Sequence, residues 1–350
     1  MIHPPSWDTL RKTRGELYGL AILSVIVFHY FDGVASTGAT AGQALFASAT
    51  AYNTLVGSIG VEVFVVLSGF GIYHSLSNNP PLGAFYLRRI RRVLLPYLII
   101  GAMFWGFKDL VLMHLPGECF LRDYAFVSFW LEGVRTVWYV PFILLMYLVS
   151  PLVWRMLKAG CPSMALALAW VAGCMAAQTV VPDFYARTEI ALMRVPFFVL
   201  GMGCGRLAKK DSRVPTPLLV ALPVFALLKL HAELVHSPYI RIANGLYACF
   251  LMAAYVFVHE AALRRFEPSS RVGSVLRTCD GFLRKVGSVS YELYLSHVLL
   301  RNIGFTLGAN LTLPLCYLGC IAVSVPVALA LAQLQRKKPT KRYLRLDMQN

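Results

Sequence analysis

The chain is a series of long apolar runs separated by short basic segments. A membrane-spanning helix needs about 20 mostly apolar residues, and a set of stretches in the sequence meets that length. Charged residues make up only 14% of the chain, whereas a soluble domain carries about 25%. We therefore expect an all-α, polytopic membrane bundle of about ten transmembrane helices. The expected spans are residues 16–33, 56–76, 93–113, 137–157, 163–181, 190–208, 215–232, 240–260, 287–305 and 311–333.

Basic residues gather in every second connection between these spans. With the N-terminus in the cytoplasm, most of the 33 lysines and arginines fall on the cytoplasmic side, as the positive-inside bias requires. We therefore expect one transmembrane domain over residues 1–350 with both termini cytoplasmic: residues 1–15 as an N-terminal segment and 334–350 as a basic tail. We expect the first apolar run to be a retained helix rather than a cleaved signal. Because the net charge of +16 lies in short loops, it predicts topology and not nucleic-acid binding.

The cysteines and glycines predict packing. None of the eight cysteines forms a C-x-x-C pair, and most lie in or beside apolar runs, where a free cysteine behaves as a small hydrophobe. We expect no disulfide framework and no metal site. Gly201, Gly203 and Gly205 predict a close helix-packing face.

Two of the apolar runs carry an ionisable residue. An ionisable side chain inside hydrocarbon costs about 2.5–3.5 kcal/mol, which favours a function for His29, in GELYGLAILSVIVFHY, and for Glu62. His29 lies about 20 Å along the first helix from Glu16, and antiparallel neighbours would bring Glu62 to a similar depth. A carboxylate that orients an imidazole supports a general base. The alternative is a histidine bonded to a backbone carbonyl and a glutamate near the lipid headgroups.

Four arginines follow the second span, in FYLRRIRRVLLPY. On an α-helix Arg88, Arg91 and Arg92 share one face, with Arg89 beside them. Guanidinium groups bind phosphate through two hydrogen bonds, and this segment faces the cytoplasm, where a phosphorylated nucleotide cofactor is present. The alternative is a topology signal that contacts lipid headgroups.

Other polar and aromatic residues mark a candidate substrate site. His297 lies near the bilayer midplane of the ninth expected span, where it either lines a cavity or packs through a hydrogen bond. Trp138 and Tyr139 begin the fourth span at the outer interface, as part of an aromatic belt or as a sugar-stacking platform. Glu189 and Arg194 straddle the outer start of the sixth span and could bind a polar acceptor or each other.

Six segments, in order along the chain, resemble one family. The chain is similar to the membrane-bound acyltransferase 3 family, the bacterial O-acetyltransferase-like integral membrane proteins. The matching segments are GLAILSVIVFH (19–29), GVEVFVVLSGFGIYHSL (60–76), FYLRRIRRVLLPYLI (85–99), VWYVPFILLMYLVSPL (137–152), RVPFFVLGMGCGR (194–206) and VGSVSYELYLSHVLL (286–300).

The resemblance implies a multi-pass protein of the bacterial cytoplasmic membrane. It implies transfer of an acyl group, commonly acetyl, from cytoplasmic acyl-CoA to a hydroxyl of an extracytoplasmic glycan or glycolipid. His29 takes the place of the essential first-helix histidine. The family usually has an arginine eleven residues before this histidine, where this chain has Tyr18, and Arg14, one turn earlier, could substitute. The family's arginine motif corresponds to Arg88, Arg89, Arg91 and Arg92.

These observations favour an O-acyltransferase with acetyl-CoA as donor, membrane lipid as surroundings and no metal. Direct transfer and a covalent acyl-histidine relay are both open. The alternatives are a transporter or flippase for a polar lipid or solute, and an inactive scaffold subunit that keeps the fold. A transporter explains the helices and the intramembrane charges, but not the clustering of the arginines.

Overall fold

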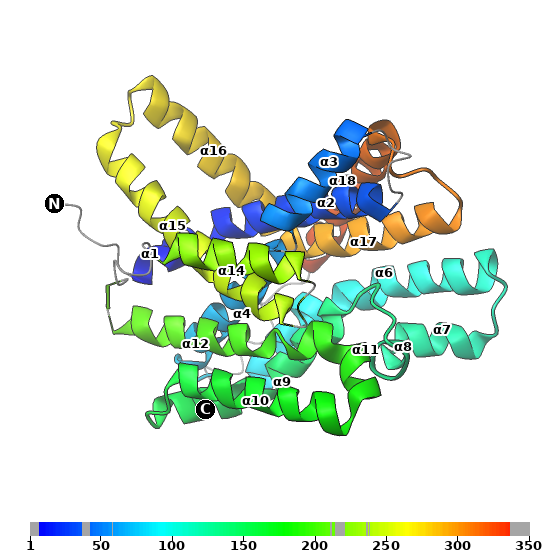
Figure 1. The fold of residues 1–350 in the computed structure, drawn as a ribbon, viewed down its shortest axis with the longest axis horizontal. Coiled ribbons are helices and arrows are strands. Elements are labelled where there is room, and N and C mark those ends of the chain that lie inside the picture. The colour runs from blue at the N-terminus through cyan, green and yellow to red at the C-terminus, as the bar shows by residue number, and fades with distance from the viewer. Residues whose placement is uncertain are drawn as a thin grey trace, which may run out of the picture.

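Helices account for the architecture, and their order follows the apolar runs of the sequence (Figure 1). The structure is a computed structural model that describes residues 7–36, 43–57, 59–210, 212–213, 221–235, 237 and 239–336. The helices of the first half are α1 (Trp7–Lys12), α2 (Arg14–Ser36), α3 (Gln43–Leu55), α4 (Ile59–Leu76), α5 (Leu82–Arg89), η2 (Ile90–Leu94), α6 (Leu95–Trp105), η3 (Gly106–Leu112), α7 (Gly117–Tyr124), α8 (Val127–Glu132) and α9 (Tyr139–Lys158). The helices of the second half are α10 (Ser163–Val180), α11 (Pro182–Leu192), α12 (Val195–Lys209), α14 (Leu222–Leu234), α15 (Ile240–Arg265), α16 (Arg271–Ser288), α17 (Ser290–Thr306) and α18 (Pro314–Arg336).

Within the described residues, eight helical segments are long and apolar enough to cross a membrane. They correspond to eight of the expected spans, so the chain is an all-α, multi-pass membrane protein. The other two expected spans correspond to shorter helices, α14 with 13 residues and α17 with 17 residues. The total of ten spans and the orientation of the termini stay predictions. Parts of the expected terminal segments, residues 1–6 and 337–350, lie outside the described residues. The same holds for residues 215–220 of the expected seventh span. The eight segments are residues 14–36, 43–76, 82–112, 139–158, 163–180, 182–209, 240–265 and 314–335.

Glycines bring α4 and α12 together at the centre of the bundle. A methyl group on Gly69 would collide with the backbone of Phe198, and one on Gly201 would collide with the backbone of Val66. Close backbone approach of this kind needs small residues in a membrane bundle. The expected packing face of α12 is therefore confirmed at Gly201.

The basic segment after α15 forms a helix, α16, that lies along α2. Figure 1 shows α15 and α16 as a hairpin. A methyl group on Gly19 of α2 would collide with the Leu283 backbone, and one on Gly287 would collide with that of Gly15. Ser270 caps the start of α16 by accepting a hydrogen bond from the Gly273 amide. The close backbone contacts at Gly19 and Gly287 hold the first turns of α2 against α16.

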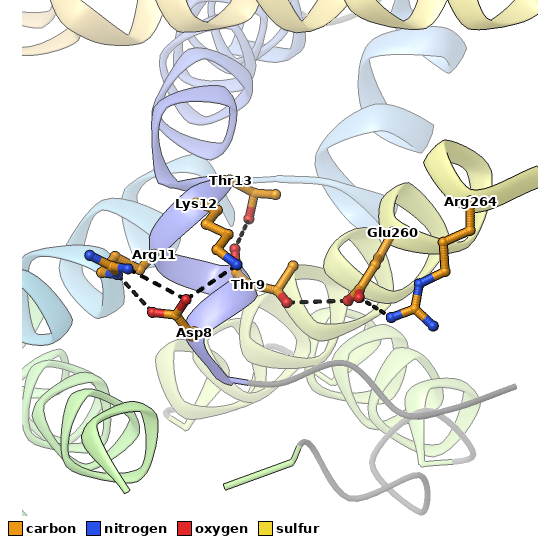
Figure 2. A network of polar contacts seen from close by, with 7 residues as sticks. All are labelled: Asp8, Thr9, Arg11, Lys12, Thr13, Glu260 and Arg264. Carbon is orange, nitrogen blue, oxygen red and sulfur yellow. Dashed lines mark hydrogen bonds and ion pairs between the residues drawn. The ribbon is translucent and has the colours of Figure 1, made fainter. Parts of the chain in front are cut away.

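Helix α1 is joined to α15 by a polar network (Figure 2). Thr9 donates a hydrogen bond to Glu260 at 3.2 Å, and Glu260 also pairs with Arg264. On α1 itself Asp8 pairs with Arg11 at 2.7 Å and with Lys12 at 3.4 Å. The hydrogen bond from Arg11 lowers the pKa of Asp8 below its usual value. The network holds α1 at the end of the bundle where α2 begins.

Candidate active site

A cavity of about 180 Å³ lies between α2, α4, α9 and α17 and reaches the α5–η2 segment. Arginines and tyrosines supply most of its polar surface. We call the end of the bundle that holds these arginines the basic end. The polar and aromatic lining residues include Arg14, Tyr18, Arg89, Arg92, Tyr139, Tyr147, Tyr291 and Tyr294.

Arg14 and Tyr18, at the start of α2, line the cavity together. Arg14 donates a hydrogen bond to the Tyr18 hydroxyl at 3.1 Å, and its guanidinium carbon lies 5.2 Å from the Tyr18 ring centroid. On α4, Gly71 faces the Arg14 guanidinium, and any side-chain atom there would collide with it. Because glycine has no side chain, the Arg14 guanidinium can pack against the α4 backbone at Gly71. Arg14 therefore places a cation beside Tyr18, and its substitution for the family's arginine stays a prediction.

Two of the four clustered arginines line the cavity. Arg89 ends α5 and stacks near the rings of Phe85 and Tyr147, at 5.5 and 5.8 Å from their centroids. Arg92, on the π-helical turn η2, donates to Glu292 of α17 at 2.9 Å. Glu292 is fully buried, so its charge holds the guanidinium at the cavity wall.

The expected arrangement of Arg88, Arg91 and Arg92 on one functional face is wrong. The cavity face carries Arg89 and Arg92, whereas Arg88 and Arg91 do not line it. Arg89 and Arg92 are three residues apart, a spacing that also shares one face of a helix. Contacts with Tyr147 of α9 and Glu292 of α17 decide which arginines reach the cavity.

His29 of α2 stacks on His297 of α17. Their ring centroids are 5.4 Å apart, with an angle of 23° between the ring planes. His297 is fully buried, and its Nε2 lies 3.0 Å from the hydroxyl oxygen of Tyr317 on α18. The Nδ1 atoms of both histidines are buried and have no hydrogen-bond partner among the described residues. The two rings point into the bundle and leave two polar atoms unsatisfied.

The cavity ends one helical turn before the two histidines. Its lining includes Val25, four residues before His29, and Tyr294, three residues before His297. Residues at these spacings lie on the same face of a helix. The cavity therefore runs from the three arginines at the basic end toward the histidine pair.

The family comparison agrees with this geometry. A family model described as an acyltransferase domain, of the acyltransferase 3 family, matches residues 18–333. The chain belongs to the acyltransferase 3 family. Comparison with curated proteins and with solved structures gives no match. The protein is thus a multi-pass membrane acyltransferase by family and by helix composition.

In this acyltransferase Glu62 does not lie at the depth of His29, and that expectation is wrong. Gly60 packs on Ala21 and Val25, and Phe64 stacks on Tyr18 with centroids 5.6 Å apart. Glu62 thus lies about two helical turns closer to the basic end than His29 does. Helix α3, whose Tyr52 ring contacts that of Phe31 at 4.9 Å, takes the expected place of α4 beside the end of α2.

The partner of Glu62 in the acyltransferase is Arg194. The two form an ion pair at 2.8 Å, with side chains 0% and 1% exposed. The guanidinium of Arg194 lies over the Trp138 ring, 4.6 Å from its centroid. Two buried charges that compensate each other and stack on an aromatic ring form a stable internal support, whereas either charge alone would be costly.

The remaining expected substrate residues separate into three places. Tyr139 lines the cavity, and its ring meets that of Tyr294 at 5.7 Å. Trp138 covers the Glu62–Arg194 pair. Glu189 pairs with Arg135 at 3.4 Å and with Arg241 at 3.5 Å, and not with Arg194. Contact of these residues with a substrate stays a prediction.

Three further residues contact the candidate site residues and were not selected from the sequence. Glu292 holds Arg92, Tyr317 contacts His297, and Arg301, one turn beyond His297 on α17, lies over the Phe305 ring at 4.7 Å. Arg301 is an ionisable residue inside an expected span, which is the same signal that selected His29. Tyr317 carries no such signal, because tyrosine is common near membrane interfaces.

A separate group lies where α2, α15 and α16 meet. The side chains of Glu16, His259 and Asp280 are near enough to one another to hold a metal ion, although the sequence predicts no metal site. Ion pairs account for these charges: His259 lies 3.0 Å from Asp280, and Arg284 donates to Glu16 at 2.6 Å. We assign the group to the packing of α16 on α2.

Proposed function

We propose that this protein is an integral-membrane O-acyltransferase. It transfers an acyl group, acetyl in the simplest case, from cytoplasmic acyl-CoA to a hydroxyl of an extracytoplasmic glycan or glycolipid. The observation that carries the proposal is the arginine-lined cavity that runs from the basic end to within one turn of the His29–His297 pair. A transporter site would not need three cations at the mouth of a cavity that leads to two imidazoles.

The basic end supports binding of the donor. Arg14, Arg89 and Arg92 present guanidinium groups, which bind phosphate oxygens through paired, charge-assisted hydrogen bonds. The phosphates of CoA would occupy this mouth, with the thioester arm running between the cavity tyrosines. His29 lies fifteen residues along α2 from Arg14, or about 22 Å at ~1.5 Å per residue. An extended arm rather than a compact ligand matches that separation.

His29 supports the chemistry at the far end of the cavity. In direct transfer its imidazole accepts the proton of the acceptor hydroxyl while the oxygen attacks the thioester carbonyl and the carbon–sulfur bond breaks. In a relay His29 first takes the acyl group from sulfur and then passes it to the acceptor. Both routes end with an ester and free CoA thiol, and neither needs a metal.

The test is acyl transfer by a His29→Ala variant reconstituted in vesicles that contain the producing cell's own glycolipids. Donor acetyl-CoA labelled in the acetyl group is supplied on one side without an ion gradient. We expect the wild type to label glycolipid and His29→Ala to lose at least a hundredfold in rate, as for loss of a general base or nucleophile.

The matched control is His74→Ala. His74 is also a histidine of an expected span, but it lies in the last turn of α4 and packs against Phe70 rather than on His297. Undiminished labelling by His29→Ala, in a protein that inserts normally, would remove His29 from the mechanism. Labelling that requires a gradient would favour a transporter instead.

A further inference from the structure

Tyr317 of α18 lies between the His297 ring and the backbone of α2. Its hydroxyl oxygen is 2.6 Å from the carbonyl oxygen of Ile26 and 3.0 Å from Nε2 of His297. Both contacts are buried, so water does not compete for these atoms. One hydroxyl group therefore serves a backbone carbonyl and an imidazole nitrogen at the same time.

Counting protons decides the direction of both hydrogen bonds. A carbonyl oxygen only accepts, so the single hydroxyl proton of Tyr317 is donated to Ile26. The hydroxyl oxygen then accepts, and only a protonated Nε2 of His297 can donate to it. A neutral imidazole carries one proton, so Nδ1 of His297 keeps its lone pair. We infer that Tyr317 is a positioning residue that holds His297 in the Nε2–H form and presents Nδ1 as a proton acceptor beside His29.

The surroundings of Nδ1 show what this acceptor lacks. It is buried and has no hydrogen-bond partner among the described residues, and the same is true of Nδ1 of His29. A buried polar atom without a partner is costly and calls for a ligand or a function. A proton on Nδ1 would leave a charged, buried donor with nothing to bond, which excludes the imidazolium as the resting form. A hydroxyl group that approaches Nδ1 in the plane of the His297 ring would satisfy the lone pair.

The chemical role of His297 rests on the proposed function. The acceptor hydroxyl donates to Nδ1 of His297, and its proton moves there as the oxygen bonds to the acyl carbon. In the relay, the bond from that carbon to the His29 nitrogen breaks in the same step. The proton then leaves Nδ1 for the departing His29 nitrogen. His297 is thus the base for the acceptor in the relay, in which His29 carries the acyl group.

The tautomer is tested directly, without any assay of activity. Nitrogen NMR of the protein labelled with ¹⁵N-histidine separates protonated from unprotonated ring nitrogens, and the His297 signals are those missing from a His297→Gln sample. We expect a protonated Nε2 and an unprotonated Nδ1 at neutral pH, and a mixture of forms in Tyr317→Phe. A protonated Nδ1 in the wild type overturns the inference, whatever reaction the protein catalyses.

The role in transfer is tested by comparing Tyr317→Phe with Tyr30→Phe. Tyr30 is a matched control, because its ring lies 5.1 Å from that of Tyr317 and its hydroxyl also donates to a backbone carbonyl, that of Thr312. Its hydroxyl bonds to no histidine in the described part of the chain. We expect Tyr317→Phe to transfer acetyl about tenfold more slowly with unchanged CoA affinity, since the loss of one orienting hydrogen bond corresponds to that factor. Tyr30→Phe should stay near the wild-type rate.

Equal losses in the two variants would mean that the hydroxyl groups only support packing, and would overturn the role in transfer. If the wild type transfers no acyl group, the proposed function fails, while the NMR result still decides the tautomer. The two failures are therefore distinguishable.

Discussion

Replacement of Arg89 by glutamine is the sharpest test of the donor site. Arg89 lines the cavity, and no carboxylate pairs with it among the described residues. Its guanidinium packs on the rings of Phe85 and Tyr147, and its buried Nε has no hydrogen-bond partner in the described part of the chain. Removing it therefore leaves no carboxylate unpaired. Arg92 is less suitable, because Arg92→Gln would leave the fully buried carboxylate of Glu292 without its cation.

The expected size of the effect follows from the hydrogen bonds that a phosphate would accept. A hydrogen bond to a charged group contributes about 1.5–3 kcal/mol. Loss of one such contact weakens Kd by roughly tenfold to a hundredfold, since ~1.4 kcal/mol corresponds to a factor of ten. We expect Arg89→Gln to lower the affinity for CoA by that factor and to leave thermal unfolding close to the wild type.

The assay is calorimetric titration of CoA into purified protein at fixed ionic strength, because salt screens phosphate contacts. The matched control is Arg88→Gln: the neighbouring arginine is exposed and lies outside the cavity lining, yet it changes net charge equally. We expect the control to bind CoA within about twofold of the wild type, as for an exposed charge that makes no direct contact. An equal loss in both variants would show that only bulk charge matters and would refute the assigned cavity face.

Two further substitutions test the supports of the site. Gly71→Ala should weaken CoA affinity severalfold, because the added methyl group collides with the Arg14 guanidinium. The control is Gly173→Ala, whose methyl group would meet open space. Equal CoA affinities in the two variants would contradict the close fit of Arg14 against Gly71. Glu62→Gln should lower the thermal unfolding temperature markedly, because it leaves the buried Arg194 without its counter-charge at a cost of about 3–5 kcal/mol. Unchanged unfolding in detergent would show that the ion pair is not needed for stability.

The sequence alone was enough to predict the class of fold and the family. Whether a run of about 20 residues enters a bilayer depends on its own composition, so eight expected spans correspond to helical segments of the right length and character. His29 could be found for the same reason, since one imidazole in an apolar run is visible without knowing its neighbours. The motifs that resemble the acyltransferase 3 family are equally local, and the family model matches the region that contains them.

Only the tertiary structure decided which residues meet. Glu62 and His29 are both single ionisable residues in apolar runs, but α3 lies beside the end of α2 that holds His29. Glu62 therefore lies closer to the basic end, where it pairs with Arg194. The choice of Arg89 over Arg88 depends on how this segment packs against α9, where Arg89 lies over the Tyr147 ring, and helical spacing alone does not predict it. His29 meets His297, and His297 meets Tyr317, through contacts among α2, α17 and α18. Such contacts depend on how the helices pack and not on any single run, which is why the sequence indicates the groups and the fold determines their partners.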